Sequence, residues 1–291
     1  MTSADLKRAV QLAARGELTR VWNEIHVRLY KAAYETVFTL SSGFRKGPAP
    51  KPPGKLSIQT DFPVAYESPD HIAPSGTKEN NNTNKKFVLF MNEFISKKFP
   101  GEDKYFLDLG CSGGQLVKDF LDLNWVAAGL EGSDYSLKRK RANWATLAGT
   151  NLFTCDITKP YQVLQDGRPV RFHLITAWEV LEHIATPDLP SLFRWIAHHL
   201  HEGGYFVAST TGTPDVVNGV ELHQTQMNNA EWRQYMRTHI QDLEEEDLGL
   251  KIYQYVRYNF LHPSFLIYRK VQHANTSTTA SARSSRFQSA S

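Results

Sequence analysis

Short apolar runs alternate with amphipathic segments through the middle of the chain. The run at 105–109 ends in small residues, and the segment 116–123 follows it with helical spacing. Similar apolar runs recur farther along, at 126–130, 151–157, 172–177 and 203–210. Strands that alternate with helices in this way predict a doubly wound α/β fold, in which ligands bind beyond the carboxyl ends of the strands.

The small residues after the first strand predict a ligand-binding turn. Gly110, Ser112 and Gly114 alternate with other residues, and the backbone there can approach a ligand closely. The helix that follows directs unpaired N–H groups at the same place. A dinucleotide site requires G-x-G-x-x-G, and this pattern fails because Ser112 and Gln115 stand at its second and third glycine positions.

Acidic residues mark the first three strands. Asp108 lies inside the first strand, Glu131 ends the second, and Asp156 ends the third. Glu131 comes about 20 residues after the turn, the position from which a carboxylate accepts both hydroxyls of a ribose.

In this order, the turn, the two strand-end acids and the stretch 179–184 resemble the motifs of class I S-adenosylmethionine methyltransferases of the small-molecule or glycan type. The resemblance covers residues 86 to about 270 and departs from the family at Ser112, where a glycine is usual. It implies a Rossmann-like, seven-stranded sheet, mostly parallel with an antiparallel last strand. S-adenosylmethionine is the implied cofactor. The residues assigned to it by resemblance are Asp108, Gly110, Cys111, Ser112, Gly113, Gly114, Glu131, Gly132, Asp156, Ile157 and Trp178.

Three residues are candidates for acid–base catalysis at the methyl acceptor. Glu179 and His183 are four residues apart, so on a helix they would share a face. A structural role for His183 is an equal alternative. His223, in the long loop after the fifth strand, is the first choice for a base. We expect no metal, because Trp178 stands where catechol-type enzymes of the family place a metal-binding acid.

The expected function is metal-independent methyl transfer to a small-molecule or glycan acceptor, most simply a hydroxyl. The Asn/Asp-Pro-Pro-Tyr/Phe motif of DNA-base enzymes is missing, so we expect no DNA partner. One alternative is an RNA-modifying methyltransferase that uses the basic run 138–141, although a solvated surface explains that run more simply. Another is a non-catalytic S-adenosylmethionine-binding protein, against which the three strand acids argue.

Composition limits the other possibilities. The chain has 291 residues, 41% of them hydrophobic, and a net charge of +3, so no nucleic-acid partner is required. Two cysteines, and an N-terminus without a signal-peptide core, are typical of a cytoplasmic protein. No apolar run is long enough to span a membrane.

The chain divides by pattern into four parts. The pattern predicts a helical cap at residues 1–46, through which a homodimer could form. It predicts a proline-rich linker and a lid over the pocket at residues 47–85. Residues 86–271 form the methyltransferase domain, and 272–291 a disordered tail. Within the domain we expect a helix at 135–147, a solvated acidic run at 244–247, and an antiparallel strand pair at 251–260 and 264–270.

Overall fold

The computed structural model describes residues 54–74, 76–77, 81, 83, 85–240, 242–249 and 264–271. The expected N-terminal cap, the proline-rich part of the linker, the strand at 251–260 and the C-terminal tail lie outside the described residues. Among the described helices, none combines the length and the apolar composition needed to cross a membrane.

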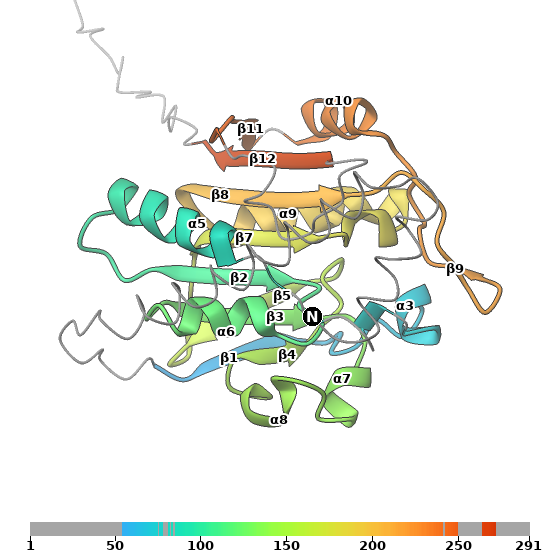
Figure 1. Ribbon diagram of the computed structural model, residues 1–291, viewed down its shortest axis with the longest axis horizontal. Coiled ribbons are helices and arrows are strands. Elements are labelled where there is room, and N and C mark those ends of the chain that lie inside the picture. Colours follow the sequence, from blue (N-terminus) through green and yellow to red (C-terminus); the bar gives the residue numbers. More distant parts are fainter. Residues whose placement is uncertain are drawn as a thin grey trace, which may run out of the picture.

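A seven-stranded sheet forms the centre of the molecule (Figure 1). The pairs from β8 to β4 are parallel, and β12 runs antiparallel to both of its neighbours. The expected fold class, with its reversed last strand, is therefore confirmed. From one edge to the other, the strands are β11 (Leu243–Glu245), β12 (Ser264–Lys270), β8 (Leu200–Thr210), β7 (Phe172–Trp178), β2 (Tyr105–Leu109), β3 (Val126–Glu131) and β4 (Leu152–Thr154).

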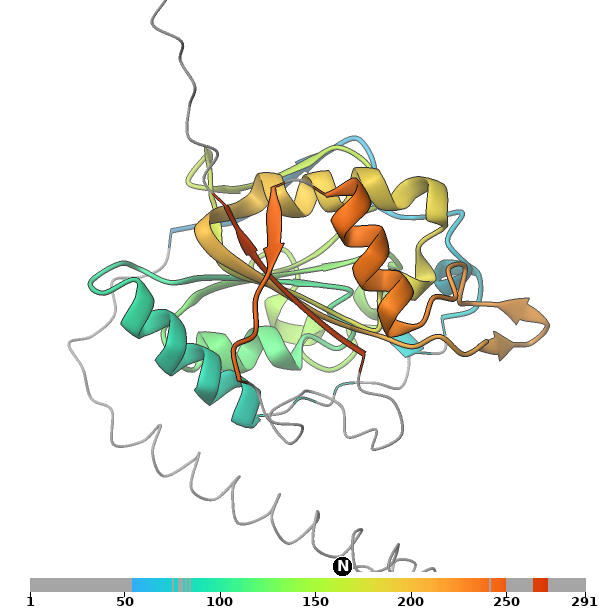
Figure 2. The same cartoon turned by 90° about the horizontal axis from the view of Figure 1, so that it is seen from above.

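Helices cover both faces of this sheet, and Figure 2 shows the layers. α5 (Lys85–Lys98) and α6 (Gln115–Leu121) pack on one face, and α9 (Leu189–His199) and α10 (Asn229–His239) on the other. Successive residues of a strand point to opposite faces, so Phe106 of β2 joins the core beneath α5 while Leu107 joins the core beneath α9. Both faces are buried, which explains the almost continuous apolar runs of the central strands.

A second, smaller sheet lies beside the first. β1 (Leu56–Thr60) pairs antiparallel with β5 (Tyr161–Gln165), which also pairs with β6 (Arg168–Pro169). Residues 56–60, which the sequence analysis included in the linker and lid, form strand β1. The strand fixes the start of the chain segment that follows, residues 61–74, which contains the short helix α3 (Pro69–Ile72).

A hairpin projects from the loop between β8 and α10 (Figures 1 and 2). β9 (Val216–Val217) and β10 (Val220–Glu221) are joined by two residues, Asn218 and Gly219, both with positive φ. This is the turn chemistry that matches the twist of a two-residue hairpin.

The prediction of one continuous helix at 135–147 is wrong. The structure has two short helices there, α7 (Tyr135–Lys138) and α8 (Trp144–Leu147). Between them Lys140 and Ala142 both have positive φ, a conformation that interrupts a right-handed helix.

The acidic run at 244–247 is not merely solvated. Its first part is the edge strand β11, and Arg269 of β12 forms ion pairs with Glu244 at 3.3 Å and Glu246 at 2.7 Å. The expected partner of β12, residues 251–260, lies outside the described residues.

His199, at the end of α9, provides a test of the core. Its ring is fully buried and stacks on Tyr161 with 4.4 Å between ring centroids. Nδ1 lies 2.9 Å from the Trp195 carbonyl and Nε2 accepts the N–H of Val163, so the ring fits as a neutral group. Burial lowers its pKa from 6.5 to about 3.

Because the unfolded chain binds a proton at this histidine and the folded chain does not, stability is lost as pH falls from 6.5 toward 3. His199→Gln should therefore flatten the pH dependence of the unfolding free energy, by up to roughly 3 kcal/mol between pH 7 and 4. Urea denaturation across this range measures the effect. The exposed His239→Gln is the control, and an equal slope in the two variants would contradict the interpretation.

Candidate active site

A cavity of about 750 Å³ opens beyond the carboxyl ends of β2, β3, β4 and β7. This is the edge of a doubly wound sheet where ligands bind, and the volume suits a cofactor together with a small acceptor. The cavity is lined by the loops that follow these strands, by the 61–74 segment and by the loop that carries the projecting hairpin.

The turn after β2 has an alternating backbone. Gly110, Ser112 and Gly114 have φ angles of +67°, +48° and +77°. Only glycine adopts this region without steric cost, so Ser112 is held in a conformation that its side chain disfavours. A Cβ at Gly110 would also collide with the Val180 side chain.

Three contacts hold Ser112 in place. Its N–H donates to Glu131 Oε2 at 2.7 Å, its carbonyl accepts from Trp144 Nε1 at 2.7 Å, and its hydroxyl accepts from Arg141 at 3.0 Å. Sequence reasoning missed Trp144 and treated Arg141 as part of a solvated basic run. The break between α7 and α8 turns both side chains toward the loop, and no local pattern in the sequence signals it.

Burial strongly affects the strand acids. It raises the pKa of Glu131 to about 7, although the N–H of Ser112 opposes the shift. Burial likewise raises the pKa of Asp108 to about 7, although a 2.6 Å hydrogen bond from the Thr176 hydroxyl opposes the shift. The third acid, Asp156, accepts from both the N–H and the hydroxyl of Thr158 with its Oδ1. All three groups are thus held by internal donors.

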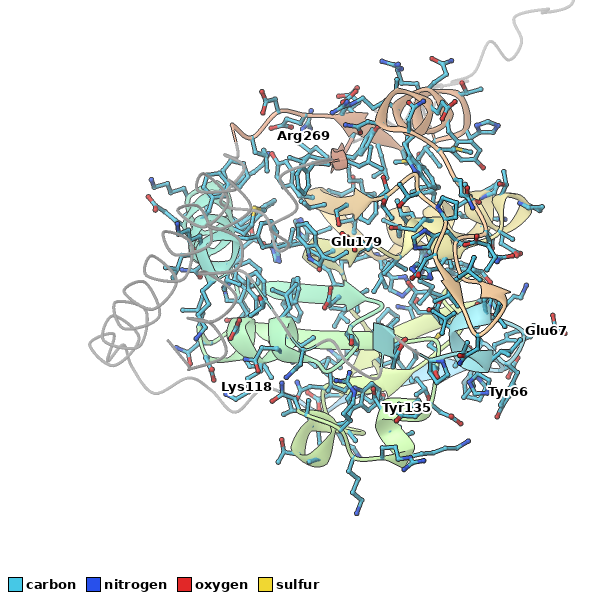
Figure 3. All side chains as sticks on the ribbon, turned by 45° about the vertical axis from the view of Figure 1, so that its right-hand side comes forward. Tyr66, Glu67, Lys118, Tyr135, Glu179 and Arg269 are labelled. Atoms are coloured by element: carbon cyan, nitrogen blue, oxygen red, sulfur yellow. The ribbon has the colours of Figure 1, made fainter. Side chains whose placement is uncertain are left out.

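The 61–74 segment is fastened across the ends of β3 and β4. The N–H of Ala65 donates to the Gly132 carbonyl, and the N–H of Asp156 donates to the Phe62 carbonyl, both at 2.9 Å. Figure 3 shows Tyr66 and Glu67 of this segment on the side of the projecting hairpin, and Glu179 nearer the middle of the molecule.

The segment after β7 is not the helix that the sequence suggested. Glu179 has a φ of +53°, and only residues 181–183 form a 3₁₀ turn, η1 (Leu181–His183). The argument that Glu179 and His183 share a helix face is therefore wrong, although both line the cavity. A non-glycine residue with positive φ at a cavity wall is the kind of local strain that clusters at functional sites.

His183 is paired with the 61–74 segment. Its Nδ1 lies 2.8 Å from Asp70 Oδ2. Burial alone would lower the pKa of His183, but Asp70, with smaller contributions from Glu182 and Asp215, outweighs burial and raises it above the usual value. Sequence reasoning did not connect Asp70 with His183, which lies more than 100 residues farther along the chain.

His223 completes the same end of the cavity. It is 7% exposed, and its ring stands edge-on to that of His183 with 4.7 Å between centroids. Its Nδ1 contacts the Thr213 carbonyl. Glu221 accepts the N–H groups of both His223 and Asp215, at 2.8 and 2.9 Å, which fixes the base of the hairpin.

Several polar atoms beneath this end lack protein partners in the described part of the chain. Glu182 is fully buried, and its Oε1 accepts from the N–H of Thr211 at 3.0 Å while Oε2 has no hydrogen-bond partner. Trp178 Nε1, Ser209 Oγ and Thr210 Oγ1 are similarly unpaired. Buried polar atoms rarely stay unsatisfied, so this region fits a polar ligand.

The structure separates the residues that the sequence assigned to the site. Asp108, Cys111, Gly113 and Gly114 do not line the cavity. The assigned residues that line it are Gly110, Ser112, Glu131, Gly132, Asp156, Ile157, Trp178, Glu179, His183 and His223.

The cavity lining is acidic. Lys159 is its only lysine or arginine within the described residues, and it lies 3.6 Å from Asp188. Such a lining attracts cationic ligands and disfavours anionic ones. The acidic lining residues are Glu67, Asp70, Glu131, Asp156, Glu179, Asp188 and Asp215.

A family model described as "Methyltransferase domain" matches residues 82–251, more than half of the chain. The chain belongs to the methyltransferase domain family. The resemblance to class I methyltransferases is thereby confirmed, and S-adenosylmethionine is the cofactor of that class.

Curated relatives match over a shorter region. The ubiquinone biosynthesis O-methyltransferase of Serratia proteamaculans is 32% identical over 108 residues, which is 37% of this chain and 43% of the relative. The enzyme of the same name from Idiomarina loihiensis is 31% identical over 108 residues, 37% of this chain and 42% of that one. The match thus spans less than half the length of these relatives.

Solved structures resemble the chain more distantly. An S-adenosylmethionine-dependent methyltransferase from Clostridium acetobutylicum is 16% identical, with a TM-score of 0.46 over 67% of this chain and 94% of that one. The amino pentose methyltransferase CalS10 from Micromonospora echinaspora is 15% identical, with a TM-score of 0.44 over 73% and 99% of the two chains.

The turn after β2 yields a direct test. Gly110→Val should abolish S-adenosylmethionine binding, because Val strains the positive φ and collides with Val180. Gly101→Val is the matched control, since Gly101 has a φ of +79° but open space around its Cα. Calorimetric titration of both folded variants measures the difference. Equal affinities would show that the turn does not contact the cofactor.

Proposed function

We propose that this cavity binds S-adenosylmethionine and that the protein transfers the methyl group to a hydroxyl of a small-molecule or glycan acceptor. The observation that carries the proposal is the hydrogen bond from the Ser112 N–H to Glu131, which brings the strained turn and a strand-end acid together on one cavity wall. Glu131 would hold the ribose, Asp156 and Ile157 the adenine, and the turn at 110–114 the methionine part, with Trp178 as a side wall.

The acidic lining supports this assignment. When bound, the cofactor supplies a methyl group on a sulfonium, which carries a positive charge. Seven carboxylates line the cavity against a single lysine, so a cationic ligand is favoured over an anionic one. Sulfonium and carboxylates are therefore complementary in charge.

The residues at the other end of the cavity would receive the acceptor. Glu179, His183 and His223 come from two separate loops and all line the cavity, and the two histidine rings are in contact. Methyl transfer requires mainly that the nucleophile be held close and aligned, and a hydroxyl must also lose its proton. These three side chains can orient the acceptor and take up the proton.

The alternative of an RNA acceptor is disfavoured by two contacts. Arg141 donates to the Ser112 hydroxyl, and Lys138 pairs with Asp134 at 2.8 Å, so half of the basic run is engaged within the protein. The cavity itself would repel phosphates. The acceptor we propose is accordingly neutral or cationic.

Glu131→Ala tests the cofactor assignment. Loss of a hydrogen bond to a charged group should weaken S-adenosylmethionine binding by roughly 1.5–3 kcal/mol, which is about 10- to 150-fold in Kd. Calorimetry on the full chain measures this change. Glu93→Ala, on α5 and outside the cavity lining, is the control. An unchanged Kd for Glu131→Ala would refute the ribose assignment.

The catalytic step needs a separate measurement. Methyl transfer from labelled S-adenosylmethionine to a panel of neutral, cationic and anionic hydroxyl compounds should favour the first two classes. Binding of the cofactor without transfer to any class would instead support the non-catalytic alternative.

The 61–74 segment should respond to the cofactor. Because it is bonded to the loops after β3 and β4, a ligand in the cavity should slow its opening. Hydrogen exchange at the amides of residues 61–74 should therefore be slower with S-adenosylmethionine than without it, while the amides of α10 stay unchanged. Equal exchange rates with and without the cofactor would show that the segment only connects β1 to the rest of the chain and does not cover the bound cofactor.

A further inference from the structure

We propose that Glu182, His183 and His223 form a binding site for one divalent transition-metal ion, such as Zn²⁺, at the acceptor end of the cavity. One ligand atom from each residue lies within 4.8 Å of the other two. Bonds of 2.0–2.2 Å to one ion need ligand atoms roughly 3–3.5 Å apart, which small side-chain rotations would achieve. Binding of the ion to these three residues can be measured directly and does not require an assay of methyl transfer.

The two histidines present the right nitrogen. His223 Nδ1 contacts a carbonyl oxygen, that of Thr213, so Nδ1 carries the proton and Nε2 keeps its lone pair. Asp70 Oδ2 lies 2.8 Å from His183 Nδ1, and although the two atoms are not aligned as a hydrogen bond, the carboxylate charge favours a proton on that nitrogen. A carbonyl or carboxylate behind each imidazole is the usual outer partner of a metal-bound histidine.

Glu182 supplies the missing anionic ligand. One carboxylate oxygen accepts from the N–H of Thr211, whereas the other is buried and has no hydrogen-bond partner among the described residues. A buried carboxylate oxygen without a partner is unfavourable, and a cation at hydrogen-bond distance would satisfy it. This oxygen is thus an independent indication of an ion.

The arrangement leaves coordination positions open toward the cavity. His183 and His223 line the cavity, and Glu182 lies behind them. Two histidines and one glutamate are a ligand set of catalytic zinc sites, in which the fourth position takes water or substrate. If the proposed function holds, the acceptor hydroxyl would occupy this position, and the ion would lower the pKa of that hydroxyl. Glu179 would then accept the proton, because both histidines would be ligands of the ion.

A second cluster shows that proximity alone does not make such a site. Glu102, His173 and His201 also lie within 4.8 Å of one another, at the opposite end of the sheet. There the N–H of Tyr105 donates to His173 Nδ1 at 3.2 Å, so the proton must sit on Nε2, which faces Glu102. That nitrogen has no lone pair for a metal.

The sequence predicted no metal because the predicted fourth strand ended at residue 177 and Trp178 followed it. In the structure β7 includes Trp178, and the residue directly after the strand is an acid, Glu179. His223 lies 40 residues beyond His183, in another loop, and only the fold brings the two rings together.

Titration of the chelator-treated full chain with Zn²⁺ tests the site. One ion should bind, and Glu182→Gln and His223→Gln should each weaken it by at least roughly 100-fold. Glu182→Gln retains an oxygen that can accept from Thr211, and thermal unfolding without metal checks its fold. Glu102→Gln is the matched control and should leave the Zn²⁺ affinity unchanged.

Substitution with Co²⁺ provides a second readout. The visible absorption of the bound ion should indicate histidine ligands and should be lost in His223→Gln. Failure of the wild-type chain to bind Zn²⁺, equal binding by Glu182→Gln, or loss of binding only in Glu102→Gln would each overturn the proposal. A parallel titration with S-adenosylmethionine measures cofactor binding separately. Failure of the metal site can thereby be distinguished from failure of the proposed function.

Discussion

The site depends on one hydrogen bond between the turn after β2 and the end of β3. The N–H of Ser112 donates to the carboxylate of Glu131, and Ser112 makes this contact in a disfavoured backbone conformation. The strain is tolerated because Trp144 and Arg141 hold the same residue from the other side. The turn after β2 and the tip of β3 are therefore one rigid unit, and a ligand that contacts either finds the other already in position.

The same unit organises the parts of the chain that precede the sheet. β1 is paired with β5, so the chain leaves the second sheet at a fixed point and crosses the loops after β3 and β4. Its far end delivers Asp70 to His183. A segment that begins almost 50 residues before β2 thus contacts both ends of the cavity. Its placement couples the wall that would hold a cofactor to the wall that would receive an acceptor.

Much of this could be predicted from the sequence, for identifiable reasons. Apolar runs ending in Glu131 and Asp156 located the strands and the cavity edge, because strand ends in a parallel sheet meet at one side. The break between α7 and α8 was not predictable, since Lys140 and Ala142 are residue types that occur in ordinary helices and yet both have positive φ here. The partnerships of Arg141 with Ser112 and of Asp70 with His183 were equally hidden, because both join distant segments.

The acceptor end of the cavity is built differently from the cofactor end. Strand ends fix Glu131 and Asp156, whereas His183 sits in a 3₁₀ turn and His223 in the loop that carries the hairpin. That loop is held at its base by Glu221 and tied beneath by Glu182, which accepts from Thr211 with its carboxylate and from Thr225 with its backbone carbonyl. Glu182 therefore joins the two loops that carry the histidines. A change in acceptor would require changes in these loops, while the sheet and the turn after β2 could stay as they are.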